Sequence, residues 1–238
     1  MRLFTLLLLA FLPQAVRPHA GVRLAPNPEL QGIDVSHYQE TIEWDTVVAK
    51  QRLDFAFVKC TEGSDYVDSL YCQNWDALGR LGVRRGAYHF FRAYGCGLEQ
   101  ARHFLETAEL LPGDFAPVLD IETTSGMSPE IMVEEALIWL QTVEAQLGVK
   151  PIIYSNHFFY ERYLAGHLDD YPLWVARYSD EAPCLTGGKC WNIWQYSNRG
   201  CYDGISSEVD VNVFHGTPEM LEELCWKPGA AGDTPVTP

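Results

Sequence analysis

The sequence predicts an α/β fold, an irregular barrel of eight β-strands with fewer than eight helices. Short β-rich runs recur along the chain, helical stretches separate most of the early ones, and no linker interrupts residues 31–224. Alternation of strand and helix favours a mainly parallel sheet, and eight such strands favour closure into a modified, TIM-like barrel. An open doubly wound sheet is the alternative. No glycine-rich phosphate-binding loop follows the first strand, which weakens its usual nucleotide-binding form.

Eight strands are expected where runs rich in β-branched and aromatic residues recur. They lie at 31–36, 54–60, 85–91, 116–122, 151–155, 172–177, 192–197 and 208–214. Successive side chains of a strand point to opposite faces. Ile33 and Val35 therefore share a face, and Asp34 points to the other.

Five helices are expected between the earlier strands. They lie at 44–52, 68–81, 98–110, 129–147 and 157–165. The fourth is the clearest, because Ser128 is a natural N-cap, Pro129 suits the first turn and Gly148 follows as a C-cap. Residues 178–191 and 198–207 lack helical periodicity. We therefore expect the last strands of the barrel to have lost their helices.

Both ends of the chain are expected to lie outside this single domain. Residues 1–20 combine Arg2, an apolar run of about ten residues and small residues at Ala15 and Ala20. This pattern indicates a signal peptide cleaved near one of the alanines, whereas a membrane anchor needs about 18 apolar residues. Residues 227–238 are rich in Pro, Gly and Thr and are expected to form a flexible tail. The protein is therefore expected to be secreted or periplasmic.

The cysteine content agrees with export. Seven cysteines occur, at positions 60, 72, 96, 184, 190, 201 and 225. An oxidising compartment would allow up to three disulfides, with one thiol left over. Cys184 and Cys190 flank a turn-rich LTGGK segment and are the best local pair, while the remaining connectivity stays open. A zinc site is the alternative, but no CxxC motif occurs.

The charge balance excludes several classes of partner. The chain of 238 residues carries 17 Lys and Arg against 32 Asp and Glu, a net charge of −15, and 47% of its residues are apolar. The apolar content excludes a disordered chain. The acidic excess argues against nucleic-acid binding and against a polybasic membrane-surface protein. We expect a monomer without stable membrane association.

Acidic side chains are expected to gather at one end of the barrel. Asp120 and Glu122 share one strand face, with Cα atoms about 6.6 Å apart. Asp34 and Asp210 each stand alone between apolar neighbours, and we expect all four acids near the C-terminal ends of their strands, where barrel active sites lie. Burial and mutual repulsion would raise one pKa of the pair, which suits the two carboxyl roles of glycoside hydrolysis. Metal sites and exposed edges also show acid-x-acid strands.

Six motifs in order carry a family resemblance. They are Gly32–Gln39 (GIDVSHYQ), Phe57–Gly63 (FVKCTEG), Gly86–Phe90 (GAYHF), Pro117–Glu122 (PVLDIE), Trp194–Tyr196 (WQY) and Val209–Asn212 (VDVN). Together they resemble the family 25 glycoside hydrolases, the CH-type lysozymes, over about residues 31–215. The resemblance implies a modified β/α barrel and N-acetylmuramidase activity on the β-1,4 bond between N-acetylmuramic acid and N-acetylglucosamine of peptidoglycan. Cys60 departs from the family pattern, where a small residue such as alanine is expected.

The resemblance also implies catalytic roles. Glu122 would be the general acid, with Asp120, Asp34 and Asp210 completing the acidic cluster. No cofactor or metal is expected, because the acids account for the chemistry. A substrate-assisted retaining route, in which Asp120 orients the 2-acetamido group, and direct water attack with inversion both stay open.

Seven further residues are candidates for substrate binding. The aromatic side chains would stack on sugars or hydrogen-bond to acetamido groups, or else belong to the core. They are Tyr88, Tyr154, Trp174 and Tyr196. Lys59, His89 and Gln195 lie near strand ends and would contact substrate or anchor the acids, although packing is favoured for His89. The alternatives to a lysozyme are a non-catalytic, lectin-like barrel, a chitinase-type glycosidase and a zinc deacetylase.

Overall fold

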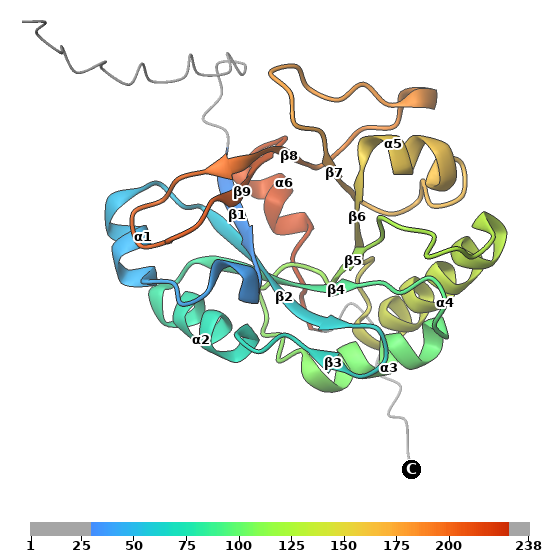
Figure 1. Ribbon diagram of the computed structural model, residues 1–238, viewed down its shortest axis with the longest axis horizontal. Coiled ribbons are helices and arrows are strands. Elements are labelled where there is room, and N and C mark those ends of the chain that lie inside the picture. Colours follow the sequence, from blue (N-terminus) through green and yellow to red (C-terminus); the bar gives the residue numbers. More distant parts are fainter. Residues whose placement is uncertain (1–29, 229–238) are drawn as a thin grey trace, which may run out of the picture.

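The computed structural model of the protein describes residues 30–228, whose strands form a ring with helices around much of its outside (Figure 1). The expected signal peptide, and the expected tail from residue 229 onward, lie outside the described residues. The strands are β1 Leu30–Val35, β2 Phe55–Glu62, β3 Tyr66–Val67, β4 Arg84–Phe90, β5 Val118–Asp120, β6 Ile152–Asn156, β7 Leu173–Ala176, β8 Ile193–Gly200 and β9 Val209–Phe214. All eight predicted strands are present.

Eight of these strands close into a barrel. Their order is β1-β9-β8-β7-β6-β5-β4-β2, and a parallel pairing between β1 and β2 completes the ring. The short β3 adds an antiparallel edge to β2. Every other pairing is parallel except those of β9, which runs antiparallel to both β1 and β8. The predicted irregular, mainly parallel barrel is confirmed.

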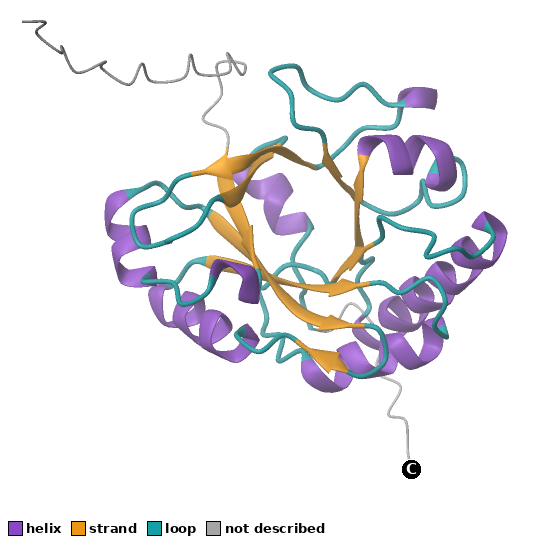
Figure 2. Cartoon of the chain, viewed as in Figure 1, coloured by secondary structure: helices purple, strands orange, loops and turns teal. Residues whose placement is uncertain are grey.

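Helices cover the first half of the barrel more completely than the second (Figure 2). They are α1 Trp44–Lys50, α2 Tyr71–Leu81, α3 Gly97–Thr107, α4 Pro129–Leu147, α5 His157–Phe159 and α6 Pro218–Glu223. The predicted bounds of α4 are confirmed, and the Ser128 hydroxyl accepts a hydrogen bond from the Ile131 amide at its start. The predicted fifth helix is short and continues as a π-helix over Tyr160–Leu164. The α6 helix was not predicted from the sequence.

Two apolar layers result from the alternation of side chains along the strands. Ile33 and Val35 belong to the layer between strands and helices. Phe55, Phe57 and Trp174 belong to the barrel interior, where α6 closes one end. A Cβ on Gly32 would lie 2.2 Å from the Phe55 ring, so glycine is needed for this ring to fill the interior. The end of the barrel interior at α6 is therefore filled by apolar side chains.

The cysteines are unpaired in this structure. Residues 30–228 contain all seven cysteines, and none of them forms a disulfide. Cys60 is buried in the layer under the helices and Cys225 in the barrel interior, so the two buried thiols cannot meet. The expected pair of Cys184 and Cys190 is not formed. The Cys190 sulfur instead lies 4.0 Å from the carbonyl oxygen of Gly188, within its own turn.

The described helices have no membrane-spanning character. Within residues 30–228, none is long and apolar enough to cross a bilayer.

Candidate active site

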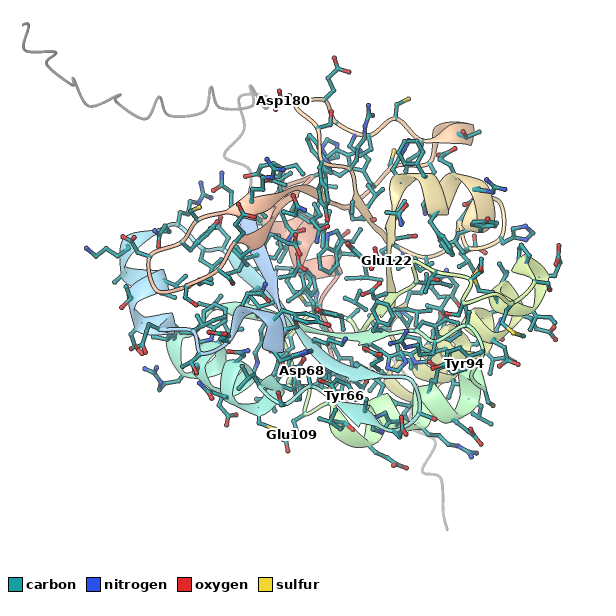
Figure 3. All side chains as sticks on the ribbon, viewed as in Figure 1. Tyr66, Asp68, Tyr94, Glu109, Glu122 and Asp180 are labelled. Atoms are coloured by element: carbon teal, nitrogen blue, oxygen red, sulfur yellow. The ribbon has the colours of Figure 1, made fainter. Side chains whose placement is uncertain are left out.

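A cavity of about 160 Å³ opens at the end of the barrel where the parallel strands finish. Its walls consist of Asp34, Ser36, Tyr38, Lys59, Tyr88, Phe90, Asp120, Glu122, Tyr154, Trp174 and Asp210. All four predicted acids are among them. In Figure 3, Glu122 lies within the ring of strands, with Tyr66 and Asp68 to one side and Asp180 to the other. Within residues 30–228, no three His, Cys, Asp or Glu side chains are grouped as metal ligands.

One detail of the acid prediction is wrong. Asp210 is the second residue of β9, at the N-terminal end of its strand and not near the C-terminal end. The antiparallel direction of β9 explains the difference, because it brings this end of the strand beside the C-terminal end of β1. Asp34 and Asp210 are partners in that pairing. The four acids therefore converge despite the reversed strand.

Asp34 is held by two amide side chains. Gln195 Nε2 donates to Asp34 Oδ2 at 2.8 Å, and Asn212 Nδ2 donates to the same oxygen at 2.7 Å. Burial raises the pKa of Asp34 to about 8, helped by the nearby Asp210 charge and opposed by these two hydrogen bonds. Burial also raises the pKa of Asp210, to about 6.

Three aromatic side chains fix the orientation of those amides. The hydroxyls of Tyr154 and Tyr178 donate to Gln195 Oε1 at 2.9 and 3.1 Å. The indole nitrogen of Trp174 donates to Asn212 Oδ1 at 2.8 Å. Because both amide oxygens accept from these donors, both amide nitrogens are directed to Asp34. Asp34 Oδ2 therefore accepts two hydrogen bonds from side chains whose orientation is fixed without a ligand.

Asp120 and Glu122 form a second carboxyl pair with a different environment. Asp120 is 6% exposed, and its Oδ1 has no hydrogen-bond partner. Burial, followed by the Glu122 charge, raises the pKa of Asp120 well above its usual range, whereas Lys59 opposes the rise. The Asp120 carboxyl is hydrogen-bonded to that of Glu122, which raises the pKa of Asp120 and lowers that of Glu122. This contact favours the protonated form of Asp120 and the ionised form of Glu122.

Glu122 also has a raised pKa. Burial is the largest cause and the Asp210 charge the second, while hydrogen bonds from Asp120 and Asn156 act in the opposite direction. Glu122 lies two residues beyond the end of β5 and is more exposed than Asp120. The pair thus combines a buried carboxyl with one at the cavity surface, both of which hold protons more tightly than free carboxyls do.

The predicted substrate-binding residues fall into two groups. Tyr88, Tyr154, Trp174 and Lys59 line the cavity, and Gln195 contacts Asp34. The structure does not bring His89 or Tyr196 to the cavity wall. Tyr196 is half-buried with its ring beside that of Trp194.

His89 lies on the outer side of the barrel, under α3 and α4. Its ring stacks on Trp139 with centroids 5.5 Å apart and lies within hydrogen-bond distance of the Thr61 hydroxyl at 2.7 Å and Gln100 Oε1 at 3.2 Å. Burial lowers the pKa of His89 to about 3, so the ring is neutral. This placement agrees with the packing interpretation that the sequence favoured.

Several residues of the site were not predicted from the sequence. Ser36, Tyr38 and Phe90 line the cavity, and Tyr178 and Asn212 belong to the hydrogen bonds around Asp34. Asn212 had a usable signal, because it shares a strand face with Asp210. Tyr178 follows β7 on an irregular loop, and no local pattern indicates its partner.

Comparison with known proteins agrees with this geometry. The family model described as "Glycosyl hydrolases family 25" matches residues 33–205. Lysozyme M1 of Streptomyces globisporus is 32% identical over 213 residues, covering 82% of this chain and 71% of that protein. The uncharacterized protein YegX of Escherichia coli K12 is 42% identical over 206 residues, covering 85% and 75% of the two chains.

Solved structures agree as well. A family 25 glycosyl hydrolase from Bacillus anthracis superposes with a TM-score of 0.78 at 30% identity, covering 86% of this chain and 97% of that one. The bacterial lysozyme from Streptomyces coelicolor gives a TM-score of 0.76 at 32% identity, covering 82% and 96%. The fold, the family match and these relatives confirm the resemblance seen in the sequence motifs. The chain is a glycoside hydrolase and belongs to glycosyl hydrolase family 25.

Proposed function

We propose that the protein is a secreted 1,4-β-N-acetylmuramidase that hydrolyses the bond from N-acetylmuramic acid to N-acetylglucosamine in peptidoglycan. The family and its lysozyme members support hydrolysis of peptidoglycan. Residues 1–20 would direct export, residues 31–224 would form the catalytic domain, and residues 227–238 would be a tail. The observation that carries the proposal is the Asp120–Glu122 pair, in which a buried carboxyl oxygen lacks a partner beside a second carboxyl of raised pKa.

Asp120 is suited to hold the acetamido group of the sugar. A buried oxygen without a hydrogen bond is costly, and an amide N–H of the substrate would satisfy it. To accept that hydrogen bond as an anion, Asp120 must be ionised, and its contact with the Glu122 carboxyl gives its proton a place to go. Substrate binding would thus move a proton from Asp120 to Glu122, which leaves Glu122 as the acid and Asp120 as the anion.

The chemistry then follows a substrate-assisted route. Glu122 donates its proton to the glycosidic oxygen as the bond from that oxygen to the anomeric carbon breaks. The acetamido carbonyl oxygen bonds to the anomeric carbon, and Asp120 stabilises the positive charge that develops on the acetamido group. Water next attacks the anomeric carbon, gives a proton to Glu122 and releases the acetamido oxygen. No cofactor takes part in these steps.

The remaining predicted site residues support this pair. Asp34 and Asp210 maintain the charge and hydrogen-bond network of the cavity. Tyr88, Tyr154 and Trp174 offer aromatic surfaces and polar edges to the sugar.

Purified peptidoglycan treated with wild type and with Glu122→Gln tests the reaction. We expect mass spectrometry of the wild-type products to show new reducing ends of muramic acid, and the variant to be slower by about 10³-fold. New glucosamine ends would indicate a different bond. Equal activity of the variant would exclude Glu122 as the acid, and the absence of any cleavage by wild type would favour a lectin-like protein.

The stereochemistry of the first product separates the two routes. Proton NMR of the anomer that forms first should show the β product, because two displacements at the anomeric carbon restore the starting configuration. An initial α product would show direct attack by water and remove the substrate-assisted route.

A further inference from the structure

A cluster of charged side chains lies on one side of the cavity, at the ends of β2 and β4. Lys59 Nζ is 2.6 Å from Glu62 Oε2, and the Arg92 guanidinium bonds the other oxygen of the same carboxylate. The Phe90 ring lies beneath both cations, each 5.0 Å from its centroid. We name Lys59, Glu62 and Arg92 the cationic cluster.

The cationic cluster carries surplus positive charge. Two cations share one carboxylate, so one positive charge is not neutralised within the cluster. Among the described residues that line the cavity, Lys59 is the only cation. The cluster therefore contrasts with the acids on the other walls, and with the net charge of −15 of the whole chain.

The exposure of the cluster increases from the cavity toward solvent. The side chain of Lys59 is 8% exposed, that of Glu62 19% and that of Arg92 35%. One cation is enough to neutralise the Glu62 carboxylate. Arg92 is the second and more exposed cation, so some of its N–H donors remain available to a ligand. Guanidinium groups suit carboxylates in particular, because their N–H groups form paired hydrogen bonds to the two oxygens.

Tyrosine side chains extend this wall outward. The Tyr66 ring lies 5.7 Å from Lys59 Nζ, and in Figure 3 Tyr66 and Asp68 are labelled below Glu122, with Tyr94 apart from them. Tyr66 and Tyr94 are both exposed. A glycan in the cavity would thus meet an aromatic and cationic surface on this side.

We propose that the cationic cluster binds a carboxylate of the glycan substrate and makes the enzyme prefer carboxylate-bearing peptidoglycan to a neutral N-acetylated glycan. The inference rests on the proposed function. Peptidoglycan presents carboxylates from two sources. One is the stem peptide, and the other is the lactyl group of muramic acid, which is free once the stem peptide is removed. Arg92 is the contact at the exposed end, and Glu62 limits the positive charge that the ligand meets.

The test compares initial rates on three soluble peptidoglycan preparations. The first is native, the second has its carboxylates converted to amides with carbodiimide and ammonia, and the third has its stem peptides removed by an amidase. We expect wild type to show a kcat/KM about fivefold higher on native than on amidated chains, as for a partly exposed ion pair. Arg92→Met should abolish this ratio, and Arg92→Lys should retain part of it.

Glu62→Gln provides a variant with the opposite sign. Removing the carboxylate raises the surplus charge of the cluster, so the preference for native over amidated chains should increase above that of wild type. A folding defect would lower both rates together and could not increase the ratio. Arg80→Met is the matched control, because Arg80 pairs with Asp45 at 2.6 Å but does not line the cavity. Its ratio should equal that of wild type.

Each outcome decides the matter. A high rate of wild type on amidase-treated chains shows that the freed lactyl carboxylate is bound as well, and a rate as low as on amidated chains restricts binding to the stem-peptide carboxylates. Equal wild-type rates on native and amidated chains, or a ratio that persists in Arg92→Met, overturn the inference while the proposed function stands. Absence of cleavage of all three preparations overturns the proposed function itself.

Discussion

Two carboxyl groups of the cavity, those of Asp34 and Asp120, differ in their hydrogen bonding. Asp34 accepts hydrogen bonds from Gln195 and Asn212, whose own oxygens are occupied by aromatic donors. Asp120 is at least as buried, yet one of its oxygens has no partner. Since an unpaired buried oxygen costs free energy, its retention at this place indicates a group that is completed by substrate. Asp34 and its hydrogen-bond partners, the Asp34 side of the site, therefore maintain its structure. Asp120 instead has an oxygen available to the substrate.

The largest expected effect compares Asp120→Asn with Asp34→Asn. Asp120→Asn removes the anion that stabilises the acetamido group, so kcat on peptidoglycan should fall by about 10³-fold, as for loss of a group that stabilises transition-state charge. Asp34→Asn retains an oxygen that accepts from Gln195 and Asn212, and kcat should fall by about tenfold. Initial rates of peptidoglycan clearing measure both. Equal losses would show that the two carboxyls are not divided in this way.

The same difference between Asp34 and Asp120 explains how much of the site could be predicted from the sequence. The period-two alternation of a strand is local information, so it correctly directed Asp34 and Asp120 into the cavity. Glu122 lines the same cavity from two residues beyond the end of β5, although the predicted strand included it. The same alternation could also have predicted the face on which His89 lies. Tyr88 and Phe90 line the cavity, and His89 between them must therefore face the helices.

The hydrogen bonds around Asp34 were not accessible in this way. Gln195 and Asp34 are 161 positions apart, and their contact depends on the order and direction of the last strands. The direction of β9 is not encoded in its alternation, which is the same for parallel and antiparallel strands. Asp210 was therefore correctly placed on the cavity face but at the wrong end of its strand.

The second prediction tests how much the hydrogen bonds around Asp34 contribute to stability. Gln195→Leu would leave Asp34, Tyr154 and Tyr178 each without one hydrogen-bond partner. We expect the free energy of unfolding to fall by about 3 kcal/mol, measured by urea denaturation. Gln141→Leu, an exposed position on α4, is the control and should change the value by less than about 0.5 kcal/mol. A loss at Gln195 no larger than this control would mean that water satisfies the network.

The third prediction concerns pH. The pKa of Asp34 is raised from 3.8 to about 8 and that of Asp210 to about 6, so the folded protein binds more protons than the unfolded chain between those values and pH 4. These groups contribute stability that is complete below pH 4 and is lost as the pH rises through about 6 and then about 8.

Thermal unfolding measures this loss. The Tm of wild type relative to that of Asp34→Asn should fall by about 3 °C between pH 5 and pH 9. The comparison with the variant removes the effect of the general negative charge, which is present in both proteins. Parallel curves for wild type and variant would show that Asp34 does not titrate in this range.

The smallest expected effect distinguishes the two tyrosines that contact Gln195. Tyr154 is 8% exposed, whereas Tyr178 is 55% exposed on the loop after β7. Each donates to Gln195 Oε1, so Tyr178→Phe leaves that oxygen with Tyr154 as its donor and should cost about 0.5 kcal/mol of unfolding free energy. Tyr154→Phe should cost about 1.5 kcal/mol, because water cannot easily replace the hydroxyl in the buried position. Urea denaturation of both variants decides the order. If Tyr178→Phe proved the more damaging, the exposed loop would be what holds Gln195 toward Asp34, and the hydrogen bonds around Asp34 would depend on an exposed contact. Asp34 would then not be the carboxyl that buried hydrogen bonds hold in place.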